Sequence, residues 1–116
     1  MKKVSASEVE EFKSGTVMTA REYGLDDETI NTAKIEVHGR YPETGWAMNE
    51  KSKQLCYILE GTGSLFVEGV EYAIAPGAAF LIQPGERFYW EANIGMLVTC
   101  TPAWSPEQYK HLEQYS

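Results

Sequence analysis

The sequence has few positive charges, few histidines and cysteines, and no long apolar run. Ten lysines and arginines stand against 17 acids, giving a net charge of -7, and this balance opposes binding to nucleic acid or to an anionic lipid surface. No run is apolar enough to cross a membrane, and no signal-peptide pattern follows Met1. We therefore expect a cytoplasmic protein with neither nucleic-acid nor membrane partners.

The two cysteines exclude a disulfide framework. Cys56 and Cys100 both lie in apolar stretches, where a thiol usually acts as a small buried hydrophobe. Two cysteines also form no recognisable metal-binding spacing. A chain of 116 residues suffices for a single domain, so we expect both thiols to be reduced and to lie in one shared core.

What the sequence does contain is a series of short strand patterns separated by turn residues. Residues 31–41 alternate between apolar and polar side chains, as a strand with one buried face does. Further turns are predicted at residues 61–63, 68–69, 75–77, 83–86 and 93–95, where glycine, proline or asparagine recurs. Close, regular turn spacing favours an all-β sandwich or small barrel over an alternating βαβ plan.

The two ends of the chain differ from this middle part. Ser5 with Glu8, or the equivalent pair two residues later, can form a capping box, and Val9 and Phe12 are spaced to share one helix face. We expect a short N-terminal helix within a flap over residues 1–30, in which residues 21–29 form a polar connection.

At the other end, Ser105 is a predicted N-cap, Pro106 the first helical residue, and Gln108 the partner in a second capping box. We expect a short C-terminal helix over residues 105–116, with Trp104 and Leu112 as its anchors. Residues 31–104 remain for the β domain.

Two motifs in this middle part are similar to those of a known family. Residues 57–61, YILEG, look like the strand end of the first cupin motif, and Gly77, Pro84 and Gly85 resemble the glycine and proline framework of the second. The chain thus resembles a small single-domain cupin over residues 31–104. This resemblance implies an all-β, cupin-type jelly-roll β-barrel with short flanking N- and C-terminal helices.

The resemblance also implies where a cupin holds its metal, namely on His-x-His and a glutamate in the first motif and a histidine in the second. These positions fall on Met48 and Glu50 (or on Ala47 and Asn49 if the spacer is one residue longer), Gln54 and Phe88. None of the usual ligands is present, so we expect no metal and no cofactor. A substitute site of His38, Glu50 and Gln54 is the alternative.

Parity along the strands then predicts the interior of the barrel. If the family positions point inward, Met48, Glu50, Gln54, Cys56 and Ile58 face the interior on one side, with Phe88 and Trp90 opposite. The candidate ligand-binding residues are Met48, Gln54, Cys56, Phe88 and Trp90 from this set, together with His38, Tyr41 and Arg87, whose side-chain chemistry suits a polar ligand. Phe88 and Trp90 either line a pocket or fill the barrel, and these alternatives stay open. Arg87 either clamps an anion or pairs with Glu86 or Glu91.

Three functions follow from these residues. The first is a metal-free protein that binds a small polar organic ligand, a sugar derivative or a carboxylic acid. The second is an isomerase or lyase with Glu50 as its acid/base. The third is a structural or regulatory dimer with a filled barrel. With Gln54 inside, Leu55, Tyr57 and Leu59 face outward, which predicts a homodimer in any of the three cases.

Overall fold

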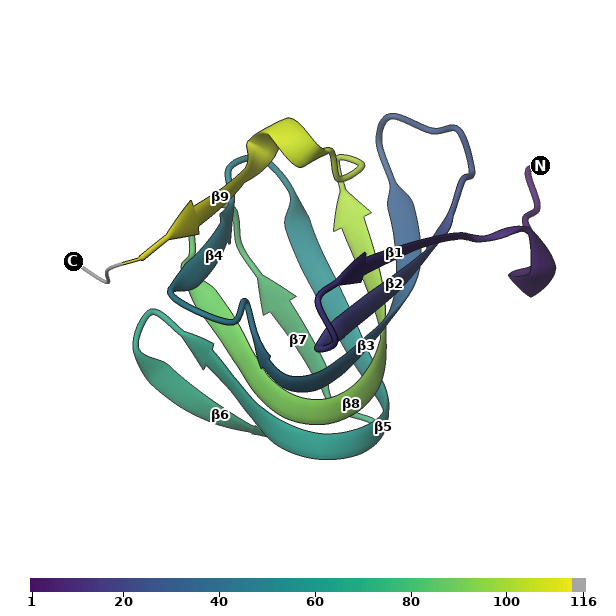
Figure 1. The fold of residues 1–116 in the computed structure, drawn as a ribbon. Helices are drawn as coiled ribbons and strands as arrows, with labels where there is room; N and C mark the ends of the chain where they lie inside the picture. The colour runs from purple at the N-terminus through teal and green to yellow at the C-terminus, as the bar shows by residue number, and fades with distance from the viewer. Residues whose placement is uncertain (114–116) are drawn as a thin grey trace.

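The computed structural model describes residues 1–113, and nearly all of its regular structure is strand. The strands curl into a barrel (Figure 1). Within the described residues the elements are η1 Ala6–Glu8, β1 Glu10–Ser14, β2 Met18–Tyr23, β3 Asn31–Tyr41, β4 Trp46–Asn49, β5 Lys53–Val67, β6 Val70–Ile74, β7 Ala79–Ile82, β8 Phe88–Thr101, η2 Pro106–Gln108 and β9 Tyr109–Leu112. The all-β class expected from the sequence is confirmed.

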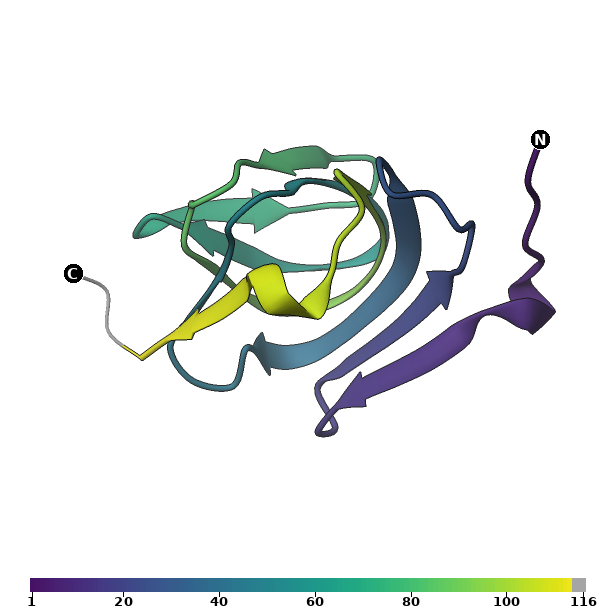
Figure 2. The same cartoon turned by 90° about the horizontal axis from the view of Figure 1, so that it is seen from above.

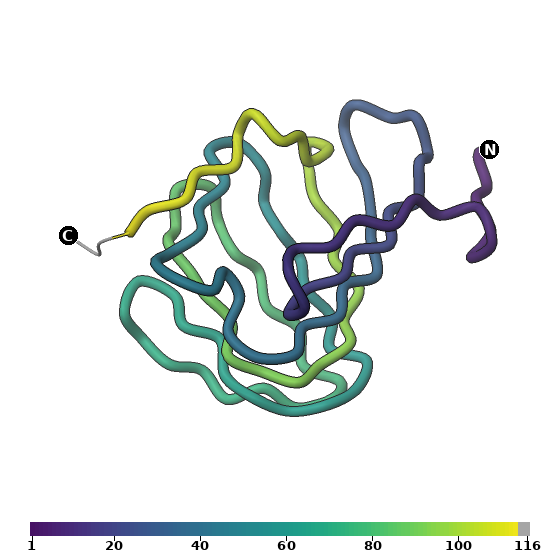
Figure 3. Tube along the Cα trace, in the orientation of Figure 1, coloured from purple at the N-terminus to yellow at the C-terminus, as the bar shows by residue number. Residues whose placement is uncertain are grey.

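β5 and β8 form the centre of the barrel. They pair antiparallel along almost their whole length, and β8 pairs with β3 on its other side. The strand order β1-β2-β3-β8-β4-β9 forms one path, while β6 and β7 pair only with β5. Seen from above, β1 and β2 extend this sheet to one side of the barrel (Figure 2). Figure 3 shows that the chain begins on that side and that β9 lies on the opposite one.

Two of the predicted turns do not exist. Residues 61–63 lie inside β5 and residues 93–95 lie inside β8, and the two stretches face each other in register. A Cβ at Gly61 would meet the backbone oxygen of Asn93 at 1.9 Å, so glycine permits close approach of the two strands here. A register shift between Ile58 and Glu60 accompanies the bend. These glycines therefore bend two long strands and do not end them.

The predicted hairpin at Glu68 and Gly69 is confirmed. Both residues have positive φ, 48° and 82°, as a two-residue type I′ turn requires, and Val67 pairs with Val70 across it.

The core consists of the inward-facing side chains of β3, β4, β5 and β8 and of one residue each from β6 and β7. Its buried members are Val37, Ala47, Cys56, Ile58, Leu65, Ile74, Ile82, Phe88, Trp90, Ala92, Ile94, Met96, Val98 and Cys100. The expected inward parity is thus confirmed on β5 and on β8. Phe88 and Trp90 are 4% and 1% exposed, so they pack as core residues.

On β4 the first of the two alignments is wrong. Ala47 and Asn49 are buried, whereas Met48 is partly exposed and Glu50 is exposed beyond the end of the strand. The second alignment, in which the spacer is one residue longer and the family positions fall on Ala47 and Asn49, therefore fits the structure. Because successive side chains of a strand alternate between its faces, an error of one residue moves Met48 and Glu50 out of the interior.

Both flanking helices are single 3-10 turns. At the N-terminus, Glu8 Oε1 accepts a hydrogen bond from Ser5 N at 2.9 Å, as the capping box predicts, but the chain then enters β1. There Phe12 pairs with Ala20 and is 48% exposed, so the expected helix face with Val9 is absent. The spacing of Val9 and Phe12 alone does not reveal that this segment pairs with the edge of β2 and forms a strand.

At the C-terminus the helix ends at Gln108. Pro106 begins the turn as predicted, but Tyr109–Leu112 form β9 along β4. The buried Gln108 side chain does not form the predicted capping box, because its Oε1 accepts hydrogen bonds from Lys51 N and Ser52 N at 3.0 and 2.8 Å. The part of the predicted helix over residues 114–116 lies outside the described residues.

Candidate functional site: the Glu22 cavity

A cavity of about 120 Å³ lies between β2, β3, β5 and β8, which we call the Glu22 cavity. Its walls are mostly apolar, and Ala33, Ile35 and Val98 contribute to them. Gln54 and Trp104 supply polar groups, and Glu22 is the one charged side chain in the lining of this cavity among the described residues. An apolar cleft with a few placed polar groups is the usual form of a small-molecule site.

A chain of hydrogen bonds runs from Trp104 into the barrel. Trp104 Nε1 donates to Asn49 Oδ1 at 2.9 Å, and Asn49 Nδ2 donates to Gln54 Oε1 at 3.0 Å. Gln54 Nε2 in turn donates to Cys56 Sγ at 3.5 Å. Asn49 and Gln54 are 3% and 8% exposed, so these hydrogen bonds give partners to side-chain amides that would otherwise be buried without them.

Glu22 has no such partner. It lies on β2 directly opposite Glu10 on β1, and no described residue forms a hydrogen bond or ion pair with it. Burial raises the pKa of Glu22, and the negative charge of Glu10 raises it further. A carboxyl group in this setting favours either a proton or a cationic partner.

A second cavity, of about 300 Å³, adjoins the first. The two cavities share Glu22, Asn31, Thr32 and Trp104. The loop between β2 and β3 and the segment after β8 border it at one end of the barrel (Figure 1), where Ala103 N donates to Glu28 O at 3.1 Å. Its acidic lining residues are Glu10, Glu22, Asp26, Asp27 and Glu28, and we call it the acidic vestibule.

The family's metal-ligand positions do not fit a metal in this chain. They hold Ala47, Asn49, Gln54 and Phe88, of which only the two amides carry donor atoms, and those amides bond to each other. Burial raises the pKa of Cys56 to about 12, so its thiol is protonated and a poor ligand. Among the described residues, no group of three or more His, Cys, Asp or Glu side chains is placed so that it could hold a metal ion.

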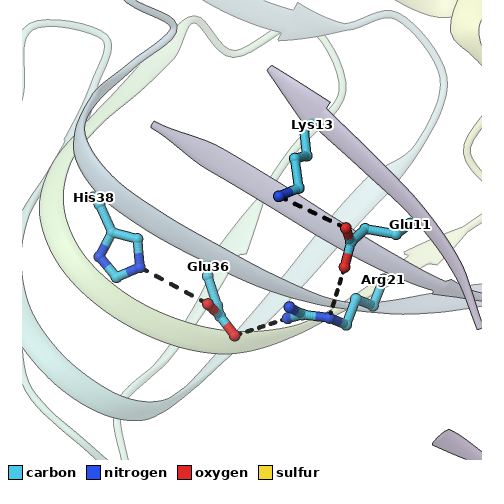
Figure 4. Close-up of polar contacts among 5 residues, drawn as sticks. All are labelled: Glu11, Lys13, Arg21, Glu36 and His38. Atoms are coloured by element: carbon cyan, nitrogen blue, oxygen red, sulfur yellow. Dashed lines mark hydrogen bonds and ion pairs between the residues drawn. The ribbon is translucent and has the colours of Figure 1, made fainter. Parts of the chain in front are cut away.

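His38 and Glu50 are surface residues. His38 lies on the outer face of β3, where its Nε2 is 3.8 Å from Glu36, at one end of an ion-pair series that continues through Arg21 to β1 (Figure 4). The side chain of Glu50 is 47% exposed and lies 3.7 Å from Lys110 Nζ. Neither residue therefore lies at the Glu22 cavity. The substitute metal site is also wrong, because it required His38, Glu50 and Gln54 to lie together.

Arg87 pairs with a glutamate that the sequence did not indicate. Its Nη2 and Nε lie 2.8 and 3.0 Å from the two carboxylate oxygens of Glu68, a partner that differs from both glutamates considered in the sequence. Met48 lies beside this pair, in a shallow groove on the outside of the barrel. Arg87 and Met48 thus lie together, away from Gln54 and Cys56.

Tyr41, Phe88 and Trp90 pack against or within the core. Tyr41 is partly buried and hydrogen bonds to Tyr109, and burial raises the pKa of its hydroxyl. None of the three lines the Glu22 cavity. Of the ligand-binding residues predicted from the sequence, only Gln54 lines it, and Cys56 lies directly behind Gln54.

Glu22 was not predicted from the sequence, because residues 21–29 were interpreted as a connection. Met18, Ala20 and Glu22 face the cavity at every second position of β2. That alternation is the signal that could have found the site.

The barrel topology, and the burial of the four residues at the cupin metal-ligand positions, are those of a cupin. The family described as "Cupin domain" matches residues 34–101, so the chain belongs to the cupin family. No curated protein matches the chain in sequence.

Solved structures share the fold over nearly the whole chain. Pac13 from Streptomyces, solved with uridine and described as a nucleoside dehydratase, has a TM-score of 0.88 at 18% identity, covering 100% of this chain and 93% of its own. Ectoine synthase from P. lautus has a TM-score of 0.75 at 18% identity, covering 97% and 90%. The polyketide cyclase RemF from Streptomyces resistomycificus has a TM-score of 0.72 at 20% identity, covering 96% and 84%.

Proposed function

We propose that the protein binds a small organic molecule in the Glu22 cavity. The observation that carries this proposal is an apolar cavity of about 120 Å³ whose lining contains one charged group without a partner. At about 120 Å³ the Glu22 cavity is somewhat smaller than a cavity of roughly 150 Å³ that binds benzene in another protein, so it suits a ligand body of at most about that size. The adjoining vestibule gives space for its polar end.

The position of this cavity supports binding over a purely structural role. Phe88 and Trp90 occupy another part of the interior, so the barrel is filled in one part and open in another. The solved structures of similar fold include proteins described as a nucleoside dehydratase and as a polyketide cyclase, which is consistent with a small-molecule site in this scaffold. Glu50 has no part in the proposal because it lies outside the cavity.

The test is thermal unfolding of the purified protein across a panel of small metabolites. A ligand at about 100 times its Kd stabilises the native state by roughly 2.7 kcal/mol, so a true ligand raises Tm measurably. Ala33→Phe fills the cavity and should remove that increase. Ala73→Phe makes the same change at an exposed position of β6 and should retain it. A panel in which no compound raises Tm would contradict the proposal.

We propose further that no metal occupies the family's ligand positions. The supporting observation is the Asn49–Gln54 hydrogen bond across these positions, together with Ala47 and Phe88, which have no donor atoms. Stoichiometric metal that survives dialysis of the purified protein would contradict this proposal.

We also infer that the protein forms a homodimer through the outer face of β5, β7 and β8. Leu55 is opposite Leu81 and Tyr57 is opposite Leu97 on neighbouring strands, and all four side chains are between 38% and 51% exposed. Contiguous exposed apolar side chains usually mark an interaction surface. Because a second copy presents the same face, a two-fold dimer would cover both.

A further inference from the structure

We propose that the ligand of the Glu22 cavity is a small organic cation, an amine with an apolar body, whose ammonium group is received by Glu22. This inference rests on the proposed function and deepens it by naming the chemical class of the ligand. It is drawn from the charge and hydrogen-bonding state of each group that faces the cavity.

The first step is that the other polar groups of the wall are already engaged. Asn31 Oδ1 accepts from Trp104 N at 3.0 Å, and Asn31 Nδ2 donates to Trp104 O at 3.4 Å. Trp104 Nε1 and the oxygen of Gln54 are held in the chain through Asn49. The carboxylate of Glu22 is therefore the strongest acceptor left for a ligand.

The second step is that the fold separates Glu22 from its nearest cation in sequence. Arg21 and Glu22 are adjacent on β2, so their side chains point to opposite faces. Arg21 lies on the outer face, where it pairs with Glu36 at 2.8 Å and with Glu11 at 3.3 Å (Figure 4). On the inner face, Glu22 is next to Glu10.

The third step is the charge around the entrance. The acidic vestibule has five acids in its lining and no lysine, arginine or histidine among the described residues. Lys2 Nζ donates to the backbone oxygen of Asp26. Hydrogen bonds from Thr29 lower the pKa of Asp27, and the charge of Lys2 adds a smaller contribution in the same direction. With a net charge of -7, the field at this entrance attracts cations.

A carboxylic acid was one of the two ligand classes expected from the sequence, and this site disfavours it. Its charge would lie beside Glu22 and Glu10, and within residues 1–113 no basic side chain lines either cavity to offset the repulsion. An ammonium group instead relieves the repulsion between the two glutamates. The apolar walls formed by Ala33, Ile35 and Val98 then suit a hydrocarbon body.

The experiment is calorimetric titration of the full chain at neutral pH with benzylamine, benzyl alcohol and benzoate. The three probes share one apolar ring and differ in charge. We expect benzylammonium to bind at least about tenfold more tightly than benzyl alcohol, because its positive charge adds an ion pair to the hydrogen bond with the Glu22 carboxylate, and benzoate to bind most weakly. Glu22→Gln should remove the preference for the amine over the alcohol.

Glu91→Gln is the matched control, since Glu91 is exposed on the outer face of β8. It should preserve the tenfold preference. Alcohol bound as tightly as the amine, or benzoate bound more tightly, overturns the cation assignment and leaves the cavity as a binding site. If none of the three probes binds but other compounds raise Tm, the cation assignment is contradicted and the proposed small-molecule site is not. If no compound binds in the titration or raises Tm in the thermal panel, both the cation assignment and the proposed function are contradicted. The order of the three probes on the unmutated protein decides the matter even if Glu22→Gln does not fold.

Discussion

Two features of its surroundings raise the pKa of Glu22. Burial removes water from its carboxyl group, and Glu10 on the neighbouring strand repels its negative charge, so both conditions raise its pKa. The folded state therefore prefers Glu22 protonated or paired with a cation. In a chain without a ligand, this preference lowers stability at neutral pH.

We predict that Glu22→Gln raises Tm at neutral pH in the absence of ligand. A group with a raised pKa contributes stability that is fully present below its ordinary pKa, about 4.3 for glutamate, and is lost as pH rises through the raised value. The amide keeps the neutral form at every pH. The gain in Tm should therefore shrink to nothing as the solution is acidified below that ordinary pKa.

The measurement is Tm against pH for the wild type, Glu22→Gln and Glu91→Gln. The control should show no comparable gain, since Glu91 is exposed on the outside of β8. A Glu22→Gln variant that is less stable than the wild type at neutral pH would mean that the carboxylate has a stabilising partner.

Several residues of the site could be predicted from the sequence and others could not. Gln54 was predicted to face inward because a family position marked it, and it lines the cavity. Met48 and Glu50 were misplaced because a loop of variable length precedes β5, and a single residue of spacer reverses parity. Arg87 could not be matched with Glu68 because that contact joins two loops that are distant in sequence.

At the scale of elements, glycine had two roles that local sequence does not distinguish. Gly69 forms a turn at the end of a hairpin, as predicted. Gly61 and Gly63 lie inside β5, where they allow β8 to cross closely. Glycine tolerates both settings for the same reason, the absence of Cβ, so only the pairing partner shows which one applies. For this reason the positions of the turns were predicted less well than the fold class.

Gly61 and Gly77 offer a matched pair that separates the two roles. Their φ angles are 90° and 89°, but a Cβ at Gly61 would meet Asn93 O at 1.9 Å, whereas at Gly77 nothing lies within 4 Å. We predict that Gly77→Ala costs about 1–2 kcal/mol from backbone strain alone. Gly61→Ala should cost more by at least about 2 kcal/mol, because β5 and β8 must also separate.

Urea unfolding of the two variants measures this difference. Equal losses of unfolding free energy would show that the approach of β5 to β8 at Gly61 is not tight in solution.

At the scale of the whole molecule, apolar side chains occur on both faces of β5. Inward residues such as Cys56 and Ile58 build the core, and outward residues such as Leu55 and Tyr57 remain exposed. A sheet covered on one face only normally alternates apolar with polar residues. The lack of that alternation in residues 54–59 could be read from the sequence, and the structure places the exposed set beside Leu81 and Leu97.

We predict that the protein is a dimer in solution and that Leu55→Glu makes it monomeric. The new charge would lie beside Leu81, where a partner copy would bury it without compensation. Val70→Glu is the control, because Val70 is 52% exposed at the tip of the β5–β6 hairpin, outside this face. Multi-angle light scattering gives the mass of each variant. A monomeric wild type at high concentration would contradict the prediction.

The barrel is open at Glu22 and filled at Trp90. A titration followed by ¹⁵N and methyl NMR, with the compound that raises Tm most in the thermal panel, distinguishes these two regions. We predict that the resonances of Ala33, Val98 and the Trp104 indole shift, while those of Trp90 and Leu65 do not. Shifts centred on Trp90 and Leu65, or on the outer groove at Met48 and Arg87, would contradict the claim.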